Sequence, residues 1–149
     1  MVVTEYLYKK FPSATSGELS WARSRAVCNP AFACVAVKKL GLHKLLLINN
    51  VELSIAIGNY VPVLETLSEE EVILHGWKQD PPKALSDVLE SVMGALFVDC
   101  DYNYDKAAAI AETVLEDLLA VLRPDLPKDP MTELMLWVGQ HGCRCVSYA

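Results

Sequence analysis

The spacing of apolar residues in the second half of the chain most restricts how the chain folds. Between residues 83 and 98, four apolar side chains recur at intervals of four, three and four residues, at Leu85, Leu89, Val92 and Leu96. This spacing places them on one face of a helix with 3.6 residues per turn, and we expect that face to enter the core. Because a second long helix is expected from about residue 106 to 122, and helical patterns recur elsewhere, the sequence predicts an all-α fold.

Local signals mark where several of the shorter helices begin and end. The spacing of a capping box, a hydroxyl residue followed three positions later by Glu, occurs at Thr15–Glu18 and at Ser68–Glu71. Asn29–Pro30 predicts another helix start, with Asn as the N-cap and Pro in the first turn. A helix is also expected within residues 51–67, where Pro62 should bend or interrupt it.

A proline-rich stretch divides the sequence into two unequal parts. Residues 124–130 contain three prolines and are interpreted as a linker. The preceding part, residues 1–123, is expected to form one domain. A short helix at 131–138 opens the remainder, and residues 131–149 are interpreted as the start of a C-terminal module.

Composition and charge exclude several classes of protein. With 52% hydrophobic and 21% charged residues, the chain is expected to fold rather than remain disordered. Its net charge of −6 argues against a self-sufficient, non-specific nucleic-acid binder, which would normally be basic. It is compatible with an enzyme that holds metal ions through carboxylates. No apolar run reaches the length of a membrane span, so no membrane partner is expected.

The first residues and the cysteines favour an intracellular location, cytoplasmic or nuclear. No basic segment and cleavage site of a secretory signal follow Met1. The five cysteines are an odd number, which favours thiols in a reducing compartment. Near the end of the chain, His141, Cys143 and Cys145 are candidate zinc ligands, but they do not by themselves complete a tetrahedral site.

The polar face of the helix at 83–98 carries the strongest candidates for a metal-binding site. Lys83, Asp87, Glu90 and Gly94 follow one another at intervals of four, three and four residues, opposite the apolar face. Asp87 and Glu90 are therefore one turn apart and can converge on one cation. Two carboxylates suit Mg²⁺, which prefers oxygen ligands and retains several waters. An ordinary solvated helix face has the same pattern, so spacing alone leaves both interpretations open.

Two ordered motifs resemble those of the ribonuclease III family. Residues 82–99, PKALSDVLESVMGALFVD, are similar to the family's second motif, which reads roughly K-x-x-x-D-x-x-E-(S/A)-x-x-G-A-(I/L)-(Y/F)-x-D. Residues 17–29, GELSWARSRAVCN, resemble an earlier family helix with the pattern G-x-L-(T/S)-x-x-R-(S/A)-x-(L/A)-V-x-N. The stretch from Phe32 to Leu53 resembles in particular the C-terminal ribonuclease III domain of Dicer and Dicer-like proteins. The resemblance covers roughly residues 1–123.

The resemblance implies an all-α, ribonuclease III-type domain that cleaves double-stranded RNA, as in the production of small RNAs. Asp87 and Glu90 would be ligands of Mg²⁺ or Mn²⁺, and Lys83 would contribute electrostatically near the phosphate. Double-stranded RNA and a second ribonuclease III domain, in the same chain or as a dimer, are the implied partners. Each domain of such a pair would cut one strand.

The sequence departs from the family pattern at both ends. The family's signature helix, near E-x-L-E-(F/W)-L-G-D-A-(V/I)-L, should stand just before Met1 and is absent from the 149 residues. It carries the other two metal-binding carboxylates, so we expect this fragment to be inactive alone and the surface beside residues 1–10 to be unusually apolar. At the other end, residues 131–149 match at most the start of a double-stranded-RNA-binding domain. The alternative function is a catalytically silent scaffold or partner domain.

Overall fold

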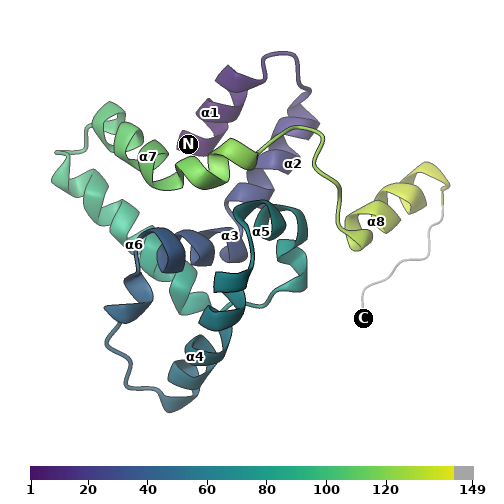
Figure 1. Ribbon diagram of the computed structural model, residues 1–149. Helices are drawn as coiled ribbons and strands as arrows, with labels where there is room; N and C mark the ends of the chain where they lie inside the picture. Colours follow the sequence, from purple (N-terminus) through teal and green to yellow (C-terminus); the bar gives the residue numbers. More distant parts are fainter. Residues whose placement is uncertain (143–149) are drawn as a thin grey trace.

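The computed structural model describes residues 1–142, and every regular element in that range is helical (Figure 1). In chain order the elements are α1 (Val2–Lys10), α2 (Ser16–Ala26), α3 (Asn29–Cys34), the π-helix η1 (Val35–Lys39), the 3-10 helix η2 (Leu42–Lys44), α4 (Val51–Thr66), α5 (Glu69–His75), the 3-10 helix η3 (Gly76–Lys78), α6 (Lys83–Asp99), α7 (Tyr104–Val121) and α8 (Pro130–Gln140). The predicted all-α fold class is confirmed. Within the same range, no helix is long and apolar enough to cross a membrane.

Most helix boundaries follow the local signals in the sequence. Both predicted capping boxes form, at the start of α2 and of α5. α3 begins one residue earlier than expected, at Asn29, with Cys28 as its extended N-cap. α4 runs through Pro62 without interruption. Proline leaves the carbonyl four residues earlier without its usual donor, and here that residue, Gly58, is exposed to water, which can replace the bond.

Two clusters of buried side chains hold the helices together. The first cluster joins α1, α2, α3, η1, α5, α6 and α7. The second joins α4 to α3, η1, α5 and α6. α6 contributes Leu89 to the first cluster and Leu85 to the second, and both side chains are almost fully buried. The body of the domain is therefore organised around α3 and α6, whereas α8 stands apart from it (Figure 1).

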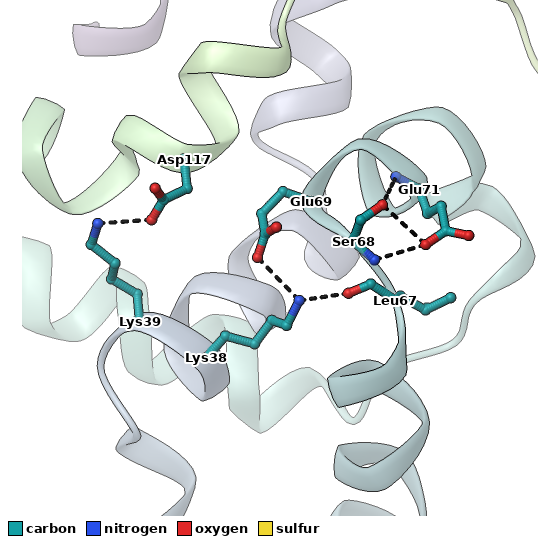
Figure 2. A network of polar contacts seen from close by, with 7 residues as sticks. All are labelled: Lys38, Lys39, Leu67, Ser68, Glu69, Glu71 and Asp117. Carbon is teal, nitrogen blue, oxygen red and sulfur yellow. Dashed lines mark hydrogen bonds and ion pairs between the residues drawn. The ribbon is translucent and has the colours of Figure 1, made fainter.

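A π-helical turn after α3 directs two adjacent lysines to different helices (Figure 2). The ammonium group of Lys38 donates a hydrogen bond to the carbonyl of Leu67 and lies 3.0 Å from a carboxylate oxygen of Glu69, at the start of α5. Lys39 pairs with Asp117 of α7 at 2.7 Å. These two lysines thus connect η1 to both α5 and α7.

Arg25 is the one charged residue among the described residues that is classed as buried. Its Nε and Nη2 atoms donate hydrogen bonds of 2.9 and 2.7 Å to the carbonyl of Ile73, in the last turn of α5. Carbonyl groups at the end of a helix lack partners within the helix and carry partial negative charge, so a guanidinium there satisfies both needs. Arg25 therefore joins α2 to the end of α5.

Replacing Arg25 should destabilise the fold markedly. Arg25→Ala removes both hydrogen bonds and leaves the Ile73 carbonyl without this partner, which we expect to lower the free energy of unfolding by about 2–3 kcal/mol. Arg23→Ala, on an exposed position of the same helix, is the matched control and should change it by less than about 0.5 kcal/mol. Urea unfolding followed by circular dichroism measures both. Equal effects of the two substitutions would contradict the role assigned to Arg25.

Candidate active site

The rotation of α6 about its own axis is fixed by three of its residues that contact other helices. Leu85 and Leu89 enter the two buried clusters. Between them, the buried Ser86 hydroxyl lies 2.8 Å from the carbonyl of Lys83 and 3.2 Å from Oδ1 of Asn29, at the start of α3. The bond to Lys83 lies within α6, but any other rotation of the helix would break the bond to Asn29 and expose Leu85 and Leu89, so the polar stripe must face outward.

That outward stripe brings together the three residues predicted from the sequence. Nζ of Lys83 lies 2.7 and 2.9 Å from the two carboxylate oxygens of Asp87. The Lys83 side chain is 75% exposed and that of Asp87 48%. The pKa of Lys83 is raised, mainly by its hydrogen bond to Asp87 and to a smaller extent by the negative charge of Glu90. Glu90, one turn further along, is exposed as well.

The donor atoms of this stripe fit part of a site for a hard divalent cation. Two carboxylates one turn apart offer the oxygen ligands that Mg²⁺ prefers, and their exposure leaves room for the waters that Mg²⁺ retains. They are too few to enclose an ion. Within residues 1–142, no group of three or more His, Cys, Asp or Glu side chains is arranged to hold a metal. Asp87 and Glu90 are therefore compatible with half of a metal site.

The second half of α6 differs from the sequence expectation. Val92, predicted to lie in the core, is 37% exposed, and Leu96 is only partly buried. After Leu89 no residue of α6 is fully buried, although Met93 still packs against the first cluster, and the helix borders a cavity of about 450 Å³. Mostly apolar side chains of α1, α2, α3, α6 and α7 line this cavity, among them Val3, Phe32, Met93, Leu96, Phe97 and Leu115. Residues 1–4 are among those that line the cavity, so it borders the start of α1, where the sequence predicts an apolar surface.

The other candidate residues either make contacts of a structural kind or lie outside the described residues. Of the predicted zinc ligands, His141 stacks on Trp137 with ring centroids 4.2 Å apart, whereas Cys143 and Cys145 lie outside the described residues. Cys34 is a free, buried thiol, and burial raises its pKa to about 11, which makes it a poor nucleophile at neutral pH.

Sequence reasoning did not identify the buried role of Arg25 or the two lysines of η1. Arg25 lies on a helix whose apolar residues show little periodicity, and no sequence signal indicated the π-turn at Val35–Lys39. Arg23, on the same helix, is exposed, so residue type alone does not identify the buried arginine.

The chain matches the ribonuclease III domain over residues 1–101. This range includes α6 with Lys83, Asp87 and Glu90. The chain belongs to the ribonuclease III domain family. No solved structure matches it significantly.

Similar proteins include several Dicer homologues. The chain is 38% identical over 116 residues to Endoribonuclease Dicer homolog 2 of Arabidopsis thaliana, an alignment that covers 76% of this chain and 8% of the relative. It is 31% identical over 143 residues to Endoribonuclease Dicer homolog 4 of Oryza sativa subsp. japonica, covering 95% of this chain and 8% of the relative. It is 32% identical over 119 residues to Protein Dicer of Schizosaccharomyces pombe, an alignment that covers 78% of this chain and 9% of the relative. The ribonuclease III domain described here thus spans less than a tenth of these relatives.

The exposed stripe of this ribonuclease III domain should be dispensable for stability. Ion pairs between solvent-exposed side chains contribute little to folding, because water and salt screen them. We therefore expect Lys83→Ala, Asp87→Asn and Glu90→Gln to leave the midpoint of urea unfolding unchanged within error. A clear loss of stability in any of the three would indicate that the stripe is structural.

Proposed function

We propose that this chain provides half of the active site of a divalent-metal-dependent endoribonuclease that cleaves double-stranded RNA. The observation that carries the proposal is the exposed stripe of Lys83, Asp87 and Glu90 within a domain of the ribonuclease III family. In this proposal Asp87 and Glu90 are metal ligands, and the ion is Mg²⁺ or Mn²⁺. A bound divalent ion activates water and stabilises charge on the oxygens of a phosphodiester.

Lys83 is proposed to act on the phosphate rather than on the ion. Its ammonium group pairs with Asp87 at the exposed end of α6, and its side chain is free to turn towards an anion. A lysine ammonium group is protonated throughout the neutral pH range, and the pairing with Asp87 raises the pKa of Lys83 further. It can therefore contribute electrostatic attraction to a phosphate group without taking part in proton transfer.

The remaining ligands are proposed to come from a helix that packs in the apolar cavity. Glu90, Met93 and Phe97 are spaced three and four residues apart, so the cavity-lining side chains continue the acidic stripe along one face of α6. Gly94 lies beside them, and no atom stands within 4 Å of where its side chain would begin. A helix seated there can approach α6 closely and bring its own carboxylates towards Glu90.

A second ribonuclease III domain is the proposed partner in cleavage. Each domain provides one site, so that two sites act on the two strands of an RNA duplex. On this proposal the chain described here cuts one strand when joined to its partner domain. It is inactive alone, because two carboxylates cannot by themselves fix the ion and the attacking water.

The proposal predicts weak metal binding by the 149-residue chain. A Mg²⁺ titration followed by NMR should shift the resonances around Asp87 and Glu90, with a dissociation constant weaker than about 1 mM, because most ligands remain water. The doubly substituted Asp87→Asn, Glu90→Gln chain should lose these shifts. Glu65→Gln, an exposed acid on α4, should retain them. Micromolar affinity for Mg²⁺ would be inconsistent with half a site.

The proposal also predicts how substitutions affect cleavage in the complete pair of domains. With a strand-labelled RNA duplex in Mg²⁺, Asp87→Asn or Glu90→Gln should abolish one of the two cuts and leave the other intact. Lys83→Ala should slow the same cut by about 10- to 100-fold, because an electrostatic contact is lost but no ligand. RNA binding should be largely unchanged in all three.

The matched control in the cleavage assay is again Glu65→Gln, which should leave both cuts at the unsubstituted rate. If neither cut depends on Asp87 or Glu90 in an active pair, the assignment of these residues is wrong. If the pair binds RNA and one strand is never cut, even without substitutions, the domain is the catalytically silent partner instead.

A further inference from the structure

The stretch that follows α7 is attached to the body of the domain rather than free of it. The side chains of Leu122 and Leu126 are 2% and 5% exposed, and both belong to the first buried cluster. Nε1 of Trp21, on α2, donates a hydrogen bond of 3.1 Å to the carbonyl of Leu126. Residues 122–126 therefore have both a buried apolar contact and a polar one with the domain.

Residues 124–126 also border a small cavity beside the first turn of α2. The pKa of Glu18 is lowered, mainly by hydrogen bonds from Thr15 and to a smaller extent by the positive charge of Lys128. Gly17, Glu18 and Trp21 of α2 face Pro124 and Leu126 across this cavity, and the exposed side chain of Lys128 lies at its edge.

Beyond this point the chain makes few contacts with the domain. α8 begins at Pro130 with Asp129 as its N-cap, and no residue of α8 is buried. Figure 1 shows the helix set apart from the other elements. Of the predicted linker at 124–130, only residues 127–129 lie between the last buried side chain and the first residue of α8.

We propose that Trp21 is a positioning residue that anchors residues 122–126 on α2 and confines the hinge of the C-terminal segment to residues 127–129. Three extended residues span at most about 10 Å, whereas seven span about 25 Å. The anchor therefore restricts where α8 and the residues after it can reach. This inference does not depend on the proposed nuclease function.

NMR of the 149-residue chain tests the anchor through its three tryptophans. The indole proton of Trp21 should exchange with solvent at least about tenfold more slowly than those of Trp77 and Trp137, which are 44% and 52% exposed. Backbone order parameters of Asp125 and Leu126 should be about 0.85, as in a rigid helix, and should fall at Lys128 and Asp129.

Substitution then separates an anchor from a merely buried side chain. Trp21→Phe keeps an aromatic ring but removes the donor, and should lower the order parameters of Asp125 and Leu126 towards that of Lys128, while amides of α1 and α7 keep theirs. Leu126→Ala should have the same local effect. Trp77→Phe is the control and should change neither. Uniform mobility from 124 to 129 without substitution, or no local change in Trp21→Phe and Leu126→Ala, would overturn the proposal.

Discussion

Burial of one stripe of α6 is the constraint on which the arrangement of the other features depends. Leu85 and Leu89 enter two different clusters, and Ser86 between them is bonded to the start of α3. Successive residues of a helix are about 100° apart, so a rotation by one position would carry Asp87 into the core. Burying an unpaired carboxylate costs several kcal/mol, and the outward position of the acidic stripe is therefore determined by packing.

The same stripe shows how far sequence reasoning extends. Period and capping signals were sufficient to predict the helices and the shared face of Asp87 and Glu90, because both are local properties of the chain. The exposure of Val92 was not predictable in this way, since it depends on which other helix covers that part of α6. Arg25 and the lysines of η1 are likewise determined by partners from 29 to 78 residues away along the sequence, Ile73, Glu69 and Asp117 among them.

Because Lys83 and Asp87 are exposed to water, each can exchange its ion-pair partner for another ligand. The ammonium group of Lys83 neutralises Asp87, but both side chains stay in contact with water, so breaking their ion pair carries only a small penalty. In the proposed site, the Asp87 carboxylate would turn towards a hydrated divalent ion and the Lys83 ammonium group towards a phosphate. A buried ion pair at the same place would resist that exchange, because each separated charge would lose its only compensation.

The net charge of −6 makes the length of the proposed hinge relevant to RNA binding. Affinity for nucleic acid comes chiefly from positive charge opposite the phosphates, whereas this chain has more acidic than basic residues. If its substrate is RNA, most of the attraction must come from cations at the acidic stripe and from modules joined to this domain. The effective concentration of a joined module falls as its tether lengthens. A hinge of three residues, rather than seven, would thus hold α8 closer to the body of the domain.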